Sequence, residues 1–164
     1  MCIVAKIYYH IKIQCKKLVL KAMYKKKLFF GKNIYWRSNF IVRVGKKAFL
    51  KIGDNVFFND NCSLNCLGTI KIGCNTLFGE NVKLYDHNHN FKYKDKLISR
   101  QGYKIGKIKV GDNCWIGSNV ILLKGAEVGD NVVIGAGCII STKIPSDSIV
   151  TANRNIKVEK IKYI

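Results

Sequence analysis

The sequence predicts an all-β fold in which short parallel strands wind into a stacked, three-sided coil, with a short N-terminal helix and a C-terminal tail. Two observations lead to this fold. A large apolar residue recurs every six residues, and a residue suited to tight turns recurs three positions after it. A helix has a period of 3.6 residues, so a period of six excludes one. A single coil cannot bury its own interior, but stacked coils form a continuous core.

The repeat is clearest from Val110, where the chain reads VGDNCW IGSNVI LLKGAE VGDNVV IGAGCI ISTKIP. The same frame begins at Ile52 and again at Ile72, with a two-residue slip near Gly68. We expect between four and five coils of about 18 residues, each about 4.8 Å from the next. The leading apolar positions in the last run are Val110, Ile116, Leu122, Val128, Ile134 and Ile140.

The other positions of the repeat also have physical roles. The fourth position holds asparagine or glycine, the residues that best tolerate a left-handed backbone, so we expect a corner at each one. These are Asn55, Asn61, Asn75, Asn81, Asn113, Asn119, Gly125, Asn131 and Gly137. The fifth position is small or β-branched and points inward. It includes Cys62, Cys114 and Cys138, which we interpret as core fillers.

The two ends depart from the repeat. Residues 1–30 form a basic segment in which helical spacing places apolar side chains on one face: Ile3, Ile7, Ile11, Cys15, Leu18 and Ala22. This face packs on the coil end or a neighbouring subunit, or it rests on an anionic membrane surface. The coil domain is expected at 31–145, with an excursion at 88–107. The tail, 146–164, is expected to pack back along the coil.

Composition narrows the choice of partner and compartment. The formal charge of +19 favours an anionic partner: nucleic acid, a membrane surface, an acidic glycan or a phosphorylated ligand. A biased use of lysine is the alternative explanation. Seven cysteines without a CxxC pair fit free thiols in a reducing cytoplasm. No apolar run approaches the roughly 20 residues of a membrane span.

Two of the three histidines lie in the segment KLYDHNHNFKYKDK, at Lys83 to Lys96. His87 occupies a corner position of the repeat, and the excursion begins directly after it. Long loops inside compact repeats are usually functional. A neutral imidazole can accept a proton from an attacking hydroxyl or amine, so His87 is a candidate general base. The alternative is that His87 and His89 are loop residues bonded to the backbone.

The hexapeptide frame over about 52–145 resembles the left-handed parallel β-helix of the hexapeptide acyltransferases, an exception to right-handed crossover. Within that family the segment FGENVKLYDHNHNF is similar to the sugar O-acetyltransferases that act on galactosides and maltose. The resemblance implies that His87 is the catalytic base, with His89 and Asp86 assisting at the acceptor. The segment FFNDNCSLNC implies that Asn59 contacts the acceptor and the transition state. Asn65 stands near the position of the family's acceptor-binding aspartate.

The segments NCWIGSNV and IGAGCII resemble the family's acetyl-CoA groove. The resemblance implies donor contacts from Gly117, Ser118 and Ala136, and an acceptor contact from Trp115. Basic and polar residues expected near the CoA phosphates are Ser141, Thr142, Lys143, Lys157 and Lys160, although the lysine stands one place later than usual. It also implies direct transfer, an oxyanion held by the backbone amides near Gly117 and Ser118, no metal, and a homotrimer with active sites between subunits.

Other functions remain open at this point. The same base could serve an N-acetyltransferase that acts on an amino sugar nucleotide. A zinc enzyme on this fold needs three histidine ligands, and the third histidine, His10, lies far away in the N-terminal helix. A non-catalytic module that binds anions or nucleic acid would use the charge alone, but no nucleic-acid motif is present. Nucleic acid is therefore not an expected partner, and the acceptor is expected to be a sugar or glycan such as a surface polysaccharide precursor.

Overall fold

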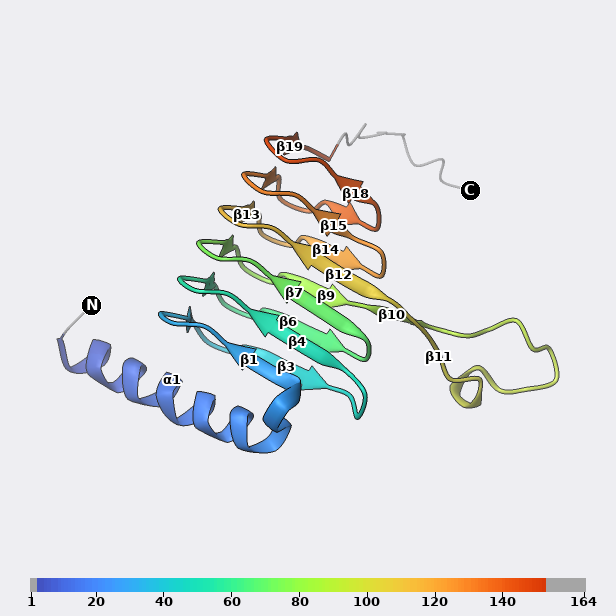
Figure 1. The fold of residues 1–164 in the computed structure, drawn as a ribbon, viewed down its shortest axis with the longest axis horizontal. Coiled ribbons are helices and arrows are strands. Elements are labelled where there is room, and N and C mark those ends of the chain that lie inside the picture. Colours follow the sequence, from blue (N-terminus) through green and yellow to red (C-terminus); the bar gives the residue numbers. More distant parts are fainter. Residues whose placement is uncertain (1–2, 153–164) are drawn as a thin grey trace, which may run out of the picture.

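The six-residue repeat folds as a three-sided coil of parallel strands (Figure 1). A computed structural model describes residues 3–152. The first face contains β1 (Leu28–Phe30), β4 (Phe49–Ile52), β7 (Thr69–Ile72), β12 (Lys107–Val110), β15 (Glu127–Val128) and β18 (Lys143–Ile144). The second contains β2 (Tyr35–Trp36), β5 (Phe57–Phe58), β8 (Leu77–Phe78), β13 (Trp115–Ile116), β16 (Val133–Ile134) and β19 (Ile149–Val150). The third contains β3 (Ile41–Val44), β6 (Ser63–Cys66), β9 (Lys83–Tyr85), β14 (Ile121–Leu123) and β17 (Ile139–Ile140).

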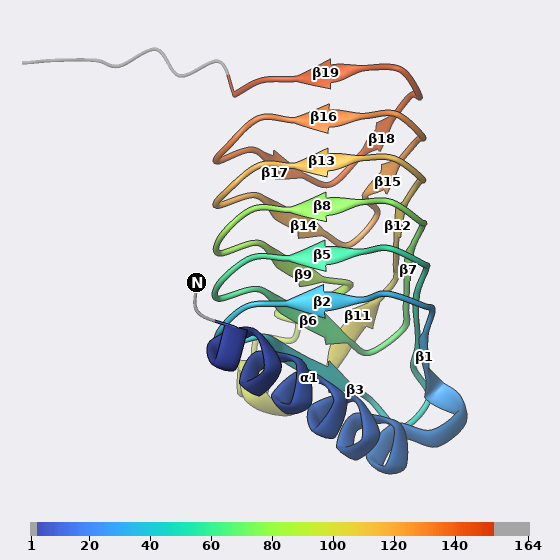
Figure 2. The same cartoon turned by 90° about the vertical axis from the view of Figure 1, so that its left-hand side faces the viewer.

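The coil is left-handed, as expected. In Figure 2 the chain runs from right to left along the near face and returns from left to right behind it while it climbs. Strands of successive coils pair in parallel and in register, so Ile52, Ile72 and Val110 stack on one another. The six leading residues of the last run are all buried. The stacked leading side chains therefore form one continuous core.

The corners form as the repeat predicts. Every asparagine and glycine named for the fourth position has a positive φ, and Asn33, Asn39 and Asp147 do as well. The asparagines also bond to one another along the coil. Asn55 donates its Nδ2 to Asn75 Oδ1 at 3.0 Å, and Asn81 donates to Asn119 at 2.8 Å. These amide bonds link successive coils at two of the three corners.

The coil is longer than the four to five turns expected from the sequence. Two faces have six strands each, and the first strand begins at Leu28. The first coil was not predicted from the repeat, because Phe40, a bulky residue, stands at the fifth position, where later coils have small or β-branched residues. Its ring stacks on Trp36 at 4.9 Å and lies 4.6 Å from Phe58, so aromatic rings fill this end of the core.

The chain beyond Pro145 also differs from the expected tail. Residues 149–150 form β19, which pairs with β16 as the last strand of the second face. Asp147 supplies the corner before it with a φ of 58°. The repeat therefore continues at least to Val150, because an aspartate can take the place of the usual asparagine.

Helix α1 (Ile3–Tyr24), followed by the short 3-10 helix η1 (Lys25–Lys27), crosses the N-terminal end of the coil (Figure 2). Its buried side chains are Ile13 and Leu20, at 5% and 7% exposure. The apolar face predicted from the sequence is turned away from the coil, with Ile11 and Leu18 56% and 68% exposed, so it does not pack on the coil end. The side chains of Ile3 and Ile7 lie outside the described set. Within residues 3–152, no helix combines the length and apolar character needed to cross a bilayer.

The excursion leaves the coil after β9. Strand β10 (His87–His89) pairs antiparallel with β11 (Tyr103–Ile105), and the short 3-10 helix η2 (Ile98–Arg100) lies between them. Gln101 is buried and ties the loop together. Its Nε2 donates to the carbonyl oxygens of Tyr93 and Lys96 at 2.9 and 2.7 Å. The coil resumes with β12.

Candidate active site

His87 is held by its neighbour in the chain. Its Nδ1 lies 3.0 Å from Asp86 Oδ1, and the imidazole side chain keeps 17% of its surface exposed. Opposite a carboxylate, Nδ1 carries the ring proton, so the lone pair is on Nε2. This is the arrangement of an oriented general base.

Asp86 has no exposed surface, and its carboxylate is fully used. Oδ1 accepts the backbone N–H of Leu67 and Oδ2 that of Gly68, both at 2.8 Å. The slip in the repeat near Gly68 thus produces the cradle in which Asp86 is fixed. Of the two roles expected for Asp86, this position supports orienting the base. It does not support contact with an acceptor.

The excursion completes the surroundings of the base. Tyr103 meets His87 edge to face, with ring centroids 5.2 Å apart, and lies 4.5 Å from the ring of His89. His89 is exposed beside it. His87 does not adopt the left-handed corner that the repeat predicts, because it begins β10 and pairs with Ile105. Tyr103 was missed by sequence reasoning, since only the pairing of β10 with β11 brings it to His87.

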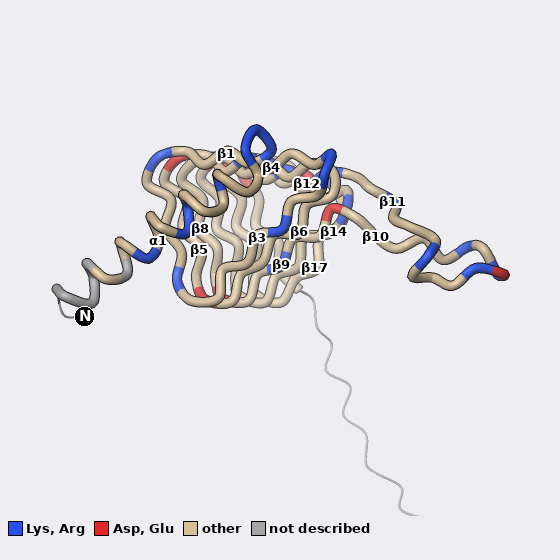
Figure 3. Tube along the Cα trace, turned by 90° about the horizontal axis from the view of Figure 1, so that it is seen from below, with Lys and Arg blue, Asp and Glu red and all other residues tan. Residues whose placement is uncertain are grey.

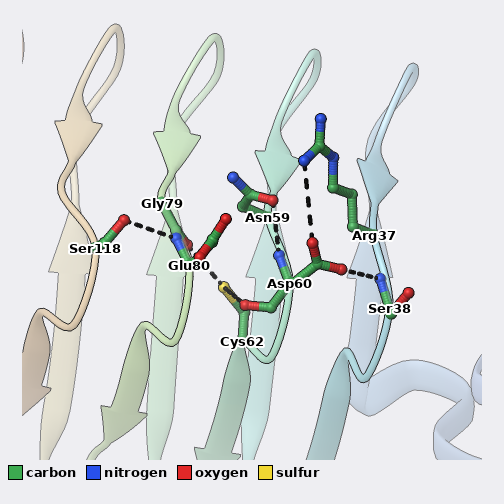
Figure 4. A network of polar contacts seen from close by, with 8 residues as sticks. All are labelled: Arg37, Ser38, Asn59, Asp60, Cys62, Gly79, Glu80 and Ser118. Carbon is green, nitrogen blue, oxygen red and sulfur yellow. Dashed lines mark hydrogen bonds and ion pairs between the residues drawn. The ribbon is translucent and has the colours of Figure 1, made fainter.

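Asn59 and Ser118 lie on a different ridge, where the second face turns into the third (Figure 4). Asn59 Oδ1 accepts the backbone N–H of Asp60 at 2.9 Å, which fixes the amide and leaves its Nδ2 facing away from that bond. Ser118 Oγ accepts the backbone N–H of Glu80 at 3.1 Å. Ser118 therefore joins two coils, whatever else it contacts.

The backbone amides on this ridge are not equivalent. The N–H of Gly117 donates to the Ile134 carbonyl at 2.7 Å, so it belongs to the strand ladder and is occupied. The expectation that it binds an oxyanion is therefore corrected. Among the described residues the Ser118 N–H has no hydrogen-bond acceptor. Ala136 continues the same ridge one coil further on and is exposed.

One chain does not bring the base and the Asn59 ridge together. His87 lies where the third face turns into the first, at the corner from which the excursion leaves (Figure 3), and Asn59 lies at the other end of that face. The extended chain from Val82 to Asp86 alone spans about 13 Å at the usual rise per residue. Counted from the N-terminal end, Asn59 is on the second coil, His87 on the third and Ser118 on the fourth. Along the coil axis, His87 therefore lies between Asn59 and Ser118.

The remaining expected site residues are spread over the surface. Asn65 lies mid-face on β6 and accepts a bond from Arg43 at 3.3 Å. Trp115 is 57% exposed on the second face. Exposed residues near the ridge that carries His87, two coils further on, are Ser141, Thr142 and Lys143. Lys157 and Lys160 lie outside the described residues.

A cleft of about 540 Å³ opens between α1 and the second face, beside the Asn59 ridge. Its walls include the aromatic rings of Tyr35 and Phe57 together with Arg37 and Asp60. Arg37 Nη1 is 4.0 Å from Asp60 Oδ2, and Asp60 Oδ1 accepts the Ser38 N–H at 2.7 Å (Figure 4). Aromatic faces beside fixed polar groups suit a carbohydrate ring.

Metal ligands do not gather in the described part of the chain. Within residues 3–152, no three histidine, cysteine, aspartate or glutamate side chains are close enough to share an ion. His10 contacts Tyr35 at a ring separation of 6.2 Å, on α1. It lies on a different element from His87 and His89.

Comparisons with known proteins agree with this architecture. The family model "Bacterial transferase hexapeptide (six repeats)" matches residues 107–142. An inferred acetyltransferase of Schizosaccharomyces pombe is 33% identical over 67% of this chain and 52% of its own length. An inferred lipopolysaccharide biosynthesis O-acetyltransferase of Escherichia coli is 27% identical over 74% of this chain and 65% of its own length. The chain thus spans about half to two thirds of these relatives.

A solved structure, galactoside acetyltransferase in complex with coenzyme A, superposes with a TM-score of 0.70 at 28% identity. The superposition covers 85% of this chain and 66% of that one. Fold and repeat together define a left-handed β-helix of the hexapeptide type. In repeat and fold the chain is thus similar to hexapeptide-repeat acetyltransferases.

Proposed function

We propose that this protein transfers an acetyl group from acetyl-CoA to a hydroxyl of a sugar or glycan, with His87 as the general base. The observation that carries the proposal is the buried Asp86, which bonds to His87 Nδ1 and leaves Nε2 free to accept a proton. The likeness to a galactoside acetyltransferase and to an inferred lipopolysaccharide O-acetyltransferase supports the choice of donor and acceptor.

The reaction balances with this one base. His87 Nε2 takes the acceptor hydroxyl proton as the oxygen attacks the thioester carbonyl carbon, which gives a tetrahedral oxyanion. The C–S bond then breaks, and the leaving thiolate of CoA takes the proton back from Nε2. General base catalysis of this kind contributes about 10² to 10⁴ in rate, and positioning of the two substrates contributes the rest.

The Asn59 ridge supplies the groups for the developing charge. Asn59 Nδ2 and the Ser118 N–H are both hydrogen-bond donors without an acceptor among the described residues, on coils two apart. Because two coils are about 10 Å apart, the Ser118 N–H is assigned to the oxyanion and Asn59 Nδ2 to the acceptor oxygen. A fixed donor of this kind stabilises developing charge strongly when water is excluded. In this proposal the pantetheine arm follows the ridge past Ser118 and Ala136, and the acceptor enters from the cleft beside Tyr35.

A homotrimer would complete the site. Within one chain His87 and Asn59 are at opposite ends of the third face, so the base must meet the ridge of another copy. The third coil carries His87, between the coils of Asn59 and Ser118, and parallel neighbours would therefore place it at the right height. Acetyl-CoA, a glycan acceptor and two further copies are the partners we propose. The free cysteines fit a cytoplasmic location.

The test is acetyl transfer to a panel of glycans and amino sugars, read by product mass. Product mass is preferred because the protein's own thiols would react with a thiol reagent. We expect His87→Ala to lower kcat by about 10² to 10⁴, while Asp95→Asn, a control in the exposed loop of the excursion, retains activity. Analytical ultracentrifugation of the same samples is expected to give a trimer.

Other outcomes would change the assignment. Equal activity in His87→Ala and the native protein would remove His87 from the mechanism. Transfer to amines alone would replace the hydroxyl acceptor with an amino sugar. A monomer that is fully active would rule out the shared site.

A further inference from the structure

Helix α1 turns an apolar stripe away from the protein. Tyr8, Ile11, Cys15, Leu18 and Ala22 follow one another at steps of three and four residues and are all exposed. Val19 and Met23 widen the stripe and are 57% and 62% exposed. The side of α1 that packs on the coil is the opposite one, with Ile13 and Leu20. Residues at these steps share one helix face, so the stripe is a continuous strip of uncovered apolar surface.

The surroundings of the stripe are entirely basic. Asp54 is the first acidic residue of the sequence, and fourteen lysines and arginines precede it. Lys12 and Lys21 are exposed along the helix, and Lys25 and Lys26 follow at its end. Lys16 and Lys17 are directed toward the coil instead. The Nζ of Lys16 donates to the Phe40 carbonyl, and that of Lys17 lies 5.8 Å from the Tyr35 ring centroid.

We propose that the exposed face of α1 docks on an anionic lipid bilayer, with the stripe among the acyl chains and the flanking lysines on the lipid phosphates. Helices of this composition lie in the plane of the interface, with the apolar face buried by about 5–10 Å. Each lysine near such a surface strengthens binding by about fivefold. The proposal rests on α1 alone and stands independently of the proposed acetyl transfer.

Charge distinguishes the bilayer from a second copy of the chain. Another copy would bring the same basic helix and the same net charge of +19 to the contact. Like charges held close together repel, whereas lipid phosphates neutralise the lysines. The helix also covers the N-terminal end of the coil (Figure 1). Its Ile13 side lines the cleft beside the Asn59 ridge, and the exposed stripe is on the opposite side, so a bilayer on the stripe would not lie between α1 and the cleft.

The experiment is co-flotation of the full chain with vesicles of phosphatidylcholine alone or mixed with phosphatidylglycerol. We expect binding to the mixed vesicles only. Leu18→Ser with Val19→Ser is expected to weaken it by about tenfold or more, because two apolar side chains no longer enter the bilayer. Ile149→Ser, which changes a side chain 77% exposed at the far end of the coil, is the matched control and is expected to bind as the native protein does.

Circular dichroism and thermal unfolding should be unchanged in all variants, because the substituted side chains are exposed. Three results would overturn the proposal. One is an absence of binding to either vesicle, and another is binding that the serine pair leaves intact. The third is a change of sedimentation in the serine pair without any change in flotation, since a second copy would then cover the stripe.

Discussion

Asp86 is a fully buried carboxylate, and both of its oxygens accept hydrogen bonds. Two backbone N–H groups and one imidazole N–H donate to its oxygens. An unpaired buried carboxylate would be very costly, so these donors make the burial possible. The consequence is that His87 has one orientation, set by a residue that substrate cannot reach. Asp86 is a positioning residue for the base.

Asp86→Asn tests this role. The amide has nearly the same shape, but its NH₂ replaces one acceptor and would face a backbone N–H. We expect unfolding to become easier by about 1–3 kcal/mol and kcat to fall at least about tenfold, while KM for acetyl-CoA changes little. Steady-state kinetics and urea unfolding measure the two effects. Asp95→Asn, in the exposed loop, is the control. Unchanged kcat with lowered stability would make Asp86 purely structural.

At the scale of the elements, the coils approach one another most closely at their glycines. A Cβ on Gly117 would lie 2.7 Å from both Ala136 N and Ile134 O, which belong to the next coil. Both atoms belong to the backbone, and the Ile134 carbonyl oxygen is held in the strand ladder by the Gly117 N–H. The repeat therefore places glycine after the leading apolar residue because the stacking distance leaves no room for a side chain. At this position the close approach, rather than a positive φ, accounts for the glycine.

Gly117→Ala is expected to lower the free energy of unfolding by about 1–3 kcal/mol, the usual cost of overpacking. Gly135→Ala is the matched variant on the next coil, where a Cβ would approach Val150 O at 3.1 Å and Thr151 only at 3.6 Å or more. It is expected to cost much less. Urea unfolding of both proteins compares them directly. Equal losses would show that the coils can separate at Gly117 without strain.

Particular residues show how far the sequence could predict the structure. The corners at Asn55 to Gly137 were predictable because a left-handed backbone demands asparagine or glycine locally. The first coil was not, since Phe40 breaks the small-residue rule and is accommodated only where α1 closes the coil end. The extended conformation of His87 depends on its pairing with Ile105, eighteen residues later in the chain. The residues next to His87 in the sequence do not predict this pairing. The buried role of Asp86 likewise required the fold to bring Leu67 and Gly68 to it.

At the scale of the whole molecule, the core contains ionisable thiols. Burial, reinforced by the nearby Asp86 charge, raises the pKa of Cys66 from 9.0 to about 12. Burial also raises the pKa of Cys62 and Cys114. All three thiols are neutral in the folded protein at neutral pH. An unfolded chain would lose these protons more readily, because water stabilises the thiolate.

The contribution of these buried thiols to the free energy of unfolding should therefore be fully present below pH 9. It should be lost as the pH rises from 9 towards 12. Cys66→Ala removes one of these groups, so its free energy of unfolding should fall less over that range than that of the native protein. Urea unfolding on either side of pH 9 gives the two slopes. Cys15→Ala, at an exposed cysteine, should keep the native slope. An identical slope in Cys66→Ala would mean that other groups cause the decline.

The stacking of the coils makes the spacing along each ridge discrete. Neighbouring coils are one strand separation apart, about 4.8 Å, and the asparagine ladders prevent intermediate positions. A whole coil can be gained beyond Val150 without moving His87 relative to Ser118 and Ala136, whereas one gained between His87 and Ser118 would displace the base by a full step. The separation of the site residues along the axis is therefore set by a whole number of coils, three from Asn59 to Ser118, and does not depend on how many coils follow.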